Sequence, residues 1–159
     1  MQLRSLAMIL LRTAPLLALA TCGGSKDGTT RRLSCDHHTT IRVVAEGVQH
    51  QRGEMHMALF ESSAGFPGKP EQSLQRSVAS MTGNTATVQF DPVPCGTYAV
   101  SVFHDEDGNG EMERDWLGRP QEGWGVSNNA TGSFGPPSFE DSAFEAAGDS
   151  VTVRLKLRY

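Results

Sequence analysis

The sequence has no excess of basic residues. Its 14 Lys and Arg are outnumbered by 18 Asp and Glu, so the chain of 159 residues carries a formal net charge of −4. Proteins that bind nucleic acids usually present a basic patch or stripe. The composition therefore argues against nucleic acid as a partner.

Charge is also scarce at the N-terminus, and the apolar stretch there is short. Arg4 and Arg12 are the only charged residues in the segment 1–20. The uncharged run after Arg12 is far below the ~20 residues of a membrane-spanning helix. The tripeptide A-L-A at 18–20 fits the small-x-small rule for signal-peptide cleavage. We therefore predict that residues 1–21 are a signal peptide and that the protein is exported, to the periplasm or to an outer-membrane anchor.

Cysteine is scarce, and the number of cysteines is odd, which is awkward in an oxidising compartment. Residues 19–22, L-A-T-C, resemble the lipobox of bacterial lipoproteins, although Thr21 stands where Gly or Ala is usual. Two alternatives stay open. The mature chain is either free, or a lipoprotein anchored to the membrane through Cys22, which leaves Cys35 and Cys95 as an even pair for a disulfide. We expect residues 22–38 to form a flexible linker.

Glycine and proline are plentiful, in contrast. The 17 Gly and 8 Pro favour a turn-rich, all-β protein, and the length allows one domain with its own core. Alternation of apolar and polar residues predicts about seven short strands, which indicate a single Greek-key β-sandwich over residues 39–159. The predicted strands cover residues 39–48, 54–60, 74–80, 85–90, 97–104, 143–147 and 151–159.

Local signals predict some of the connections. An R-G turn separates the strands 39–48 and 54–60, so we expect these two to pair as a hairpin. The loop 61–73 is rich in Gly and Pro and is expected to hold a helical turn after Pro70. Tyr98 follows a turn and resembles the tyrosine corner of β-sandwiches, whose hydroxyl binds nearby backbone.

Residues 105–141 form a long stretch without a strand period. Loops longer than ~15 residues in a compact domain are usually functional or disordered. This one has too many large apolar residues for disorder, so we predict an ordered flap over one edge of the sandwich. Its aromatic residues either pack beneath the flap, which we favour because aromatics dominate core burial, or form a platform for sugar rings or a peptide. They are Trp116, Trp124, Phe134 and Phe139.

The flap begins with a run of acidic and amide residues, D-E-D-G-N-G-E-M-E, from residue 105 to residue 113. Calcium takes six to eight hard oxygen ligands, and carboxylates on alternate residues can wrap around one ion. The ligands predicted by this spacing are the side chains of Asp105, Asp107 and Asn109, the carbonyl of Glu111, and Glu113 directly or through water.

The same run departs from an EF-hand in two ways. Trp116 occupies the twelfth position, where a bidentate Glu is required, and no helical pattern flanks the loop. Asp115 or an acid distant in sequence would have to complete the ligand shell. The competing interpretation is a polar turn, since Asp, Asn and Gly tolerate turn dihedrals.

No nucleophile-elbow or zincin motif accompanies the histidines. His104 could act with Glu122 and Ser127, but neighbouring strand residues point to opposite faces, so His104 and Asp105 would not share a pocket. We favour a strand-end histidine that bonds the flap. Four other histidines could combine in a metal site, but we expect the first two to be solvated: His37, His38, His50 and His56.

Three separated motifs resemble the bacterial exported family known as domain of unknown function 2141. They are G-T-Y-A-V-S-V-F-H-D-E-D-G-N-G at 96–110, L-G-R-P-Q-E-G-W-G-V-S-N-N-A at 117–130 and F-G-P-P-S-F-E-D-S-A-F at 134–144. The resemblance implies a periplasmic or secreted β-sandwich of transthyretin-like or carboxypeptidase-regulatory-like topology, and it implies no activity. The sequence departs from the usual family pattern at Cys95 and Glu113.

Two functional hypotheses follow. The first, which we favour, is a non-catalytic envelope module with a binding or structural role toward an envelope or extracellular ligand. The second is a small metal-dependent hydrolase that uses the loop 105–113. A hydrolase needs an open coordination position and an activated water, whereas a structural calcium site is closed.

Overall fold

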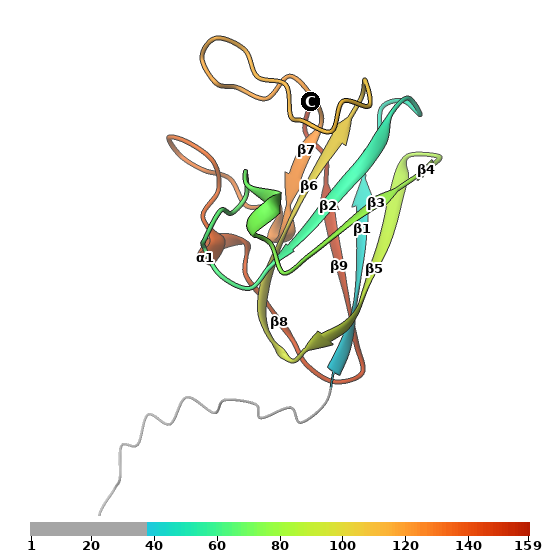
Figure 1. Ribbon diagram of the computed structural model, residues 1–159, viewed down its shortest axis with the longest axis vertical. Helices are drawn as coiled ribbons and strands as arrows, with labels where there is room; N and C mark the ends of the chain where they lie inside the picture. Colours follow the sequence, from blue (N-terminus) through green and yellow to red (C-terminus); the bar gives the residue numbers. More distant parts are fainter. Residues whose placement is uncertain (1–37) are drawn as a thin grey trace, which may run out of the picture. The chain divides into compact units, whose positions relative to one another are not determined.

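The computed structural model describes residues 38–159, which form a sandwich of two β-sheets (Figure 1). The predicted signal peptide, Cys22, Cys35 and His37 lie outside the described residues, as does nearly all of the predicted linker. No helix in the described part of the chain is long and apolar enough to cross a membrane. The prediction of an all-β sandwich is confirmed.

Nine strands lie within residues 38–159. One sheet has the order β4-β5-β1-β9, and the other has the order β3-β2-β6-β7 with β8 paired to β6. Paired strands are antiparallel except β1 and β9. The strands are β1 His38–Glu46, β2 Glu54–Phe60, β3 Gln75–Ala79, β4 Met81–Thr82, β5 Thr85–Pro94, β6 Gly96–Asp105, β7 Trp124–Val126, β8 Phe144–Ala146 and β9 Ser150–Lys156. The short helices are η1 Pro70–Gln72, η2 Ser127–Asn129 and α1 Phe139–Ser142.

The predicted hairpin between the first two strands is wrong. β1 pairs with β5 and β9, whereas β2 pairs with β3 and β6, so β1 and β2 lie in different sheets. Each of these strands has one apolar face, and the sandwich buries both faces in one core instead of placing the strands side by side. Residues 47–53 therefore cross between the sheets, with a glycine of positive φ at each end.

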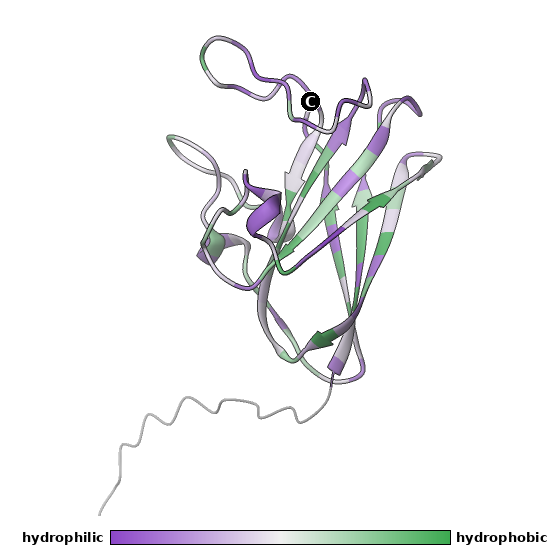
Figure 2. Cartoon of the chain, viewed as in Figure 1, coloured by the Kyte–Doolittle hydropathy of each residue, from purple (hydrophilic) through white to green (hydrophobic). Residues whose placement is uncertain are grey.

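The core lies between the sheets and is built from the inward-facing alternate residues of both. β5 follows the predicted pattern, because Ala86, Val88 and Phe90 are buried while Thr87 and Gln89 are exposed. β9 alternates in the same way. Figure 2 shows these apolar positions spread along the strands of both sheets. Truncating a buried aromatic such as Phe90 to Ala would cost about 3–5 kcal/mol of folding free energy.

Two local predictions are confirmed. The helical turn after Pro70 is η1. The Tyr98 hydroxyl donates a hydrogen bond of 2.7 Å to the Pro94 carbonyl, as in a tyrosine corner. Burial and then the Glu61 carboxylate raise the pKa of Tyr98, which keeps the hydroxyl protonated as a donor.

The flap after β6 is ordered, but it is less uniform than predicted. It contains β7, η2 and the start of α1, none of which the sequence pattern indicated. Packing of the aromatic residues is confirmed for Phe139, whose ring meets Phe66 edge-on. Trp124 is half-buried, but it belongs to β7 of the sheet itself and lines a cleft instead of packing beneath the flap. The packing prediction is wrong for Trp116 and Phe134, whose exposed fractions are 89% and 106%. Trp116 sits in a tight turn and Phe134 in an irregular loop, so the backbone holds both away from the sheet.

A cleft on the outer sheet face and the carboxylate loop beside it

The outer face of the sheet β3-β2-β6-β7 carries two rows of cross-strand neighbours. Residues directly opposite each other on paired strands share a face of the sheet. One row runs Val78, His56, Phe103 and Trp124, and the next runs Arg76, Ala58, Ser101 and Val126. The second row has small side chains at its centre, so the floor is hollow between Arg76 and Val126.

Three loops rise around this floor and enclose a cleft of about 1080 Å³. They are the loops near residues 67–71, 110–120 and 135–137. The first lies between β2 and β3, the second follows β6, and the third lies between η2 and α1. Because these loops connect strands of one sheet, they wall the outer face of that sheet. A volume of this size is at the upper end for ligand pockets.

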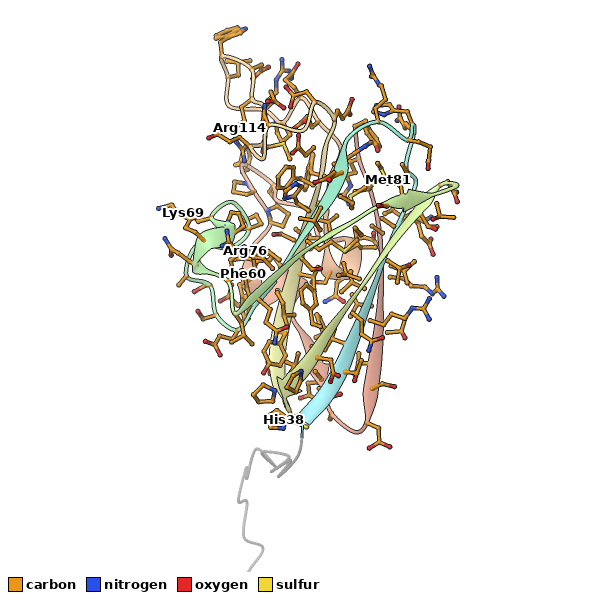
Figure 3. The ribbon with its side chains drawn as sticks, turned by 45° about the vertical axis from the view of Figure 1, so that its right-hand side comes forward. His38, Phe60, Lys69, Arg76, Met81 and Arg114 are labelled. Atoms are coloured by element: carbon orange, nitrogen blue, oxygen red, sulfur yellow. The ribbon has the colours of Figure 1, made fainter. Side chains whose placement is uncertain are left out.

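The cleft contains cationic groups that lack an acidic partner. Arg119 is the exception, because Asp115 neutralises it, with Nε and Oδ2 2.7 Å apart. In the described part of the chain the Arg114 guanidinium donates to the Gly118 carbonyl, at 3.1 Å, and to no acidic group. Among residues 38–159, no hydrogen bond or ion pair involves the guanidinium of Arg76, which stands exposed on β3. Figure 3 places Arg76 and Arg114 on the same side of the sandwich.

His56 joins the floor of the cleft to the acidic loop. Its ring stacks on Phe103 with the centroids 4.8 Å apart and the planes 20° from parallel. Its Nε2 lies 3.3 Å from Oδ2 of Asp105, without the alignment of a hydrogen bond. The contact is therefore electrostatic, and it places the end of the loop within reach of the cleft.

The carboxylate of Asp105 organises the acidic loop. Asp105 ends β6 and is buried, and its Oδ1 accepts hydrogen bonds from the backbone N–H groups of Gly108 and Asn109 at 2.8 and 3.1 Å. Its Oδ2 accepts a third from Gly110 at 2.8 Å. Burial alone would raise the pKa of Asp105, but these three N–H groups hold it below its ordinary value. The loop is thus built around an ionised carboxylate.

Glu122 is the acid that sequence reasoning missed. The β6–β7 register pairs Phe103 with Trp124, and its continuation places Glu122 beside Asp105. The Glu122 carboxylate accepts hydrogen bonds from the backbone N–H groups of Glu106 at 2.7 Å and Glu113 at 3.2 Å. Burial first, and then the neighbouring Glu113 carboxyl, raise the pKa of Glu122, and the same contact lowers that of Glu113.

The structure brings part of the predicted calcium ligand set together. Asp105, Asp107 and Glu122 can each offer a carboxylate oxygen, and these oxygens lie within 4.8 Å of one another. Asn109 is used inside the loop instead, because its amide nitrogen donates to Asp107 and Glu113 while its oxygen accepts from the N–H of Glu111. The Asp115 carboxylate accepts hydrogen bonds from the backbone N–H groups of Leu117 and Arg119, and it pairs with the Arg119 guanidinium. The side chain of Glu111 lines the cleft.

The expectation that His104 and Asp105 do not share a pocket is confirmed. His104 faces the interior, where its two ring nitrogens lie 2.8 Å from the Tyr159 hydroxyl and 2.7 Å from the Arg52 carbonyl. The prediction that His104 bonds the flap is therefore wrong for its side chain, although its backbone N–H donates to the Gly123 carbonyl of the flap at 2.7 Å. The Ser127 hydroxyl is buried and donates to the Ser142 carbonyl, away from His104.

The other histidines do not form one group. His38 begins β1, opposite Pro94, at the lower end of the molecule in Figure 3. His50 and His56 lie near the end of β6, where they contact Glu106 and Asp105. A site that combines His38 with His50 or His56 is therefore excluded by the fold.

Comparison with known proteins supports the same assignment as the three motifs. No curated protein and no solved structure matches the chain. Residues 43–154 match the family described as "Uncharacterized protein conserved in bacteria (DUF2141)", and this range spans the cleft, the acidic loop and most of both sheets. The protein therefore belongs to the DUF2141 family of bacterial proteins.

Proposed function

We propose that this protein is an exported, non-catalytic binding module of the bacterial cell envelope. Its ligand is an extended chain that carries carboxylate groups, and it lies in the cleft over β3, β2, β6 and β7. The observation that carries the proposal is Arg76, an exposed guanidinium without an acidic partner beside a hollow apolar floor. The export signal and the choice between a free chain and a lipid anchor at Cys22 are part of the proposal, on the sequence features given above.

The shape and lining of the cleft support an extended ligand. The floor is a sheet face with apolar and aromatic side chains, including Val78 and Phe103, that a chain could cover along its length. Leu117 adds an exposed apolar group from the wall. Most ligand pockets combine such apolar walls with a few polar groups that fix orientation. Here the fixing groups are Arg76 and Arg114.

Charge supports a carboxylate-bearing ligand. Guanidinium groups bind carboxylates through paired, charge-assisted hydrogen bonds. Arg76 and Arg114 are available for such bonds, because neither is paired with an acidic side chain within the described residues. The cleft lining also includes the acidic Glu71 and Glu111. The cationic feature is therefore confined to the two guanidinium groups and is not a property of the whole cleft or of the negatively charged chain.

We propose further that calcium stabilises the loop that forms one wall of the cleft. The ligands are the carboxylates of Asp105, Asp107 and Glu122. Loop carbonyls such as that of Glu111, the side chain of Glu113, and water complete a shell of six to eight oxygens. An ion there would neutralise carboxylates that otherwise repel one another.

The test of the binding proposal compares two arginines on opposite outer faces. Short extended peptides that contain Glu, and matched peptides with Gln in its place, are titrated into the protein and followed by NMR. We expect only the Glu peptides to bind, and Arg76→Gln to weaken their affinity by about tenfold, the value of one charge-assisted hydrogen bond. Arg154→Gln, on β9 of the other sheet, should bind as the wild type does. Equal binding of Glu and Gln peptides, or equal losses in the two variants, would reject the proposal.

A further inference from the structure

A second group of metal-binding side chains lies outside the cleft, where the crossing segment 47–53 meets the end of β6. The rings of His50 and His104 lie 4.8 Å apart between centroids, inclined at 42°. Glu106 follows β6 and its Oε2 lies 2.8 Å from Nε2 of His50. One ligand atom from each of these three residues falls within 4.8 Å of the other two.

The surroundings of His104 fix which of its nitrogens is available. Nε2 lies 2.7 Å from the backbone carbonyl of Arg52, and a carbonyl can only accept, so Nε2 carries the proton. Nδ1 therefore keeps its lone pair, and it accepts from the Tyr159 hydroxyl at 2.8 Å. A ligating histidine that donates its other N–H to a backbone carbonyl is the usual arrangement around protein-bound metals.

The turn that presents the Arg52 carbonyl is held in place by the backbone. Gly53 has φ +73°, and a Cβ at this position would overlap the carbonyl oxygen of Asp105. On the other side, a Cβ on Gly123 would come within 2.5 Å of the Tyr159 ring. These two glycines allow the segments around His104 to approach closely, so the buried ring is held from both sides.

His50 supplies an observation that hydrogen bonding does not explain. Its Nε2 contacts Glu106, but its Nδ1 is buried and has no hydrogen-bond partner. Buried polar atoms are nearly always paired, so an unpaired one calls for an ion, a water or a rearrangement of the ring. The side chains of His50 and Glu106 are 29% and 23% exposed, which gives them room to move toward a common ligand.

We propose that His50, His104 and Glu106 bind a divalent transition metal of the zinc class. Two imidazole nitrogens and a carboxylate suit Zn²⁺, which forms Zn–N bonds of about 2.0–2.1 Å, and they do not suit Ca²⁺, which prefers oxygen. His104 is the fixed ligand, and His50 and Glu106 close on the ion from the partly exposed side. The Tyr159 hydroxyl or a water takes the fourth position.

This site is independent of the cleft and of the calcium proposal. It uses His50, His104 and Glu106, whereas the oxygen cluster uses Asp105, Asp107 and Glu122, so the two sites share no ligand although residues 104–107 contribute to both. A bound zinc ion would tie the crossing segment, the end of β6 and Tyr159 together. It would thus brace the end of the sandwich from which the acidic loop emerges.

The test uses the full chain after treatment with a chelator. Zn²⁺ is titrated calorimetrically, and Co²⁺ is added in parallel because its absorption spectrum reports tetrahedral ligands and shows a separate charge-transfer band for thiolate. We expect one site without a thiolate band, with Zn²⁺ affinity at least about tenfold weaker in His50→Ala and in Glu106→Gln, in line with the loss of one ligand. His38→Ala serves as the control and should bind as the wild type does.

The variants leave the buried His104 in place, so they are expected to fold. Their thermal unfolding should match the wild type without metal, and only the wild type and His38→Ala should rise in Tm on addition of Zn²⁺. Wild-type affinity in both His50→Ala and Glu106→Gln would overturn the proposal. Loss of binding in His38→Ala, or a thiolate band with Co²⁺, would overturn it as well, because the metal would then lie elsewhere in the chain.

Discussion

The two outer faces of the sandwich differ although the inner faces are alike. On the sheet β4-β5-β1-β9 the outer face is polar and open, with Arg42, Gln89 and Lys156 exposed to solvent. On the sheet β3-β2-β6-β7 the outer face carries Ala58 and Phe103 and is enclosed by loops. Figure 2 shows apolar residues along the strands of both sheets.

The difference arises from the connections as well as from the strand residues. Within the open sheet, β4 and β5 are joined by a tight turn at residues 83–84. In the enclosed sheet, the segments 61–74, 106–123 and 127–143 are long, and all three contribute to or border the cleft. The strands thus form the floor of a cleft where the loops that follow them are long, and loops held on a rigid scaffold commonly carry functional residues.

The largest difference that we predict between the two faces concerns the residue that organises the longest of these loops. Asp105→Ala should reduce the free energy of unfolding by about 2–4 kcal/mol, because three backbone N–H groups lose their acceptor. The matched change on the open sheet, Asp91→Ala, removes one exposed bond from Thr40 and should cost less than about 1 kcal/mol. Urea denaturation of both variants measures the difference. Equal losses would show that the acidic loop is no better organised than the open face.

The loop beside the enclosed face should also make the folding stability depend on pH in the acid range. The folded pKa of Asp105 lies below its unfolded value, so its contribution is present above about pH 4, the unfolded pKa, and is lost as pH falls through the folded pKa. The folded pKa of Glu122 is raised, so its contribution has the opposite sign: it is present below the unfolded pKa and is lost as pH rises through the folded one.

Conservative amides separate these two contributions. The stability difference between the wild type and Asp105→Asn should shrink between pH 6 and pH 3, within the carboxyl titration range. The difference between the wild type and Glu122→Gln should instead move in the wild type's favour as pH is lowered from 7 toward 5. Denaturant midpoints at a series of pH values give both slopes, and parallel slopes would contradict the opposite environments of the two carboxyls.

The strands and several local features were predictable from the sequence. Period-2 alternation located β2, β5 and β9, and a run of β-branched and aromatic residues located β6. The turn before Tyr98 predicted that its hydroxyl bonds nearby backbone, which is the Pro94 carbonyl. Such features depend on neighbours a few residues away. The pairing of β1 with β5 and β9 was not predictable in this way, because an apolar face does not specify which sheet a strand joins.

The candidate site shows the same limit. Asp105 and Asp107 were recognisable because they lie together in one loop. Glu122 was not, since its position beside Asp105 depends on the short strand β7 returning along β6. Trp116 and Phe134 misled the prediction, because aromatic residues usually pack inward while these two project from loops into solvent.

Calcium should stabilise the acidic loop beside the enclosed face, by less than the effects predicted above. If the loop binds with the affinity of roughly 0.1–1 mM found in extracellular modules, millimolar Ca²⁺ stabilises the fold by about 1 kcal/mol through mass action. Mg²⁺ should do less because it requires a tighter octahedral shell. Asp107→Ala should abolish the rise in Tm. Glu111→Gln should retain it, because Glu111 is a proposed ligand through its backbone carbonyl and not through its side chain. Identical melting in Ca²⁺ and in chelator at matched ionic strength would leave only the polar-turn interpretation.

The smallest effect is expected on the open face. Arg154 Nη1 lies 2.9 Å from Oε1 of Glu46 across the parallel pair β1 and β9, and both side chains are substantially exposed to solvent. Because water and salt screen such a pair, Arg154→Ala should cost at most about 0.5 kcal/mol of folding free energy, less at high salt. Thermal unfolding at low and high ionic strength measures this. A loss as large as that of Asp105→Ala, unaffected by salt, would mean that the open face contributes as much to stability as the loop around Asp105, and the contrast between the two faces would not hold.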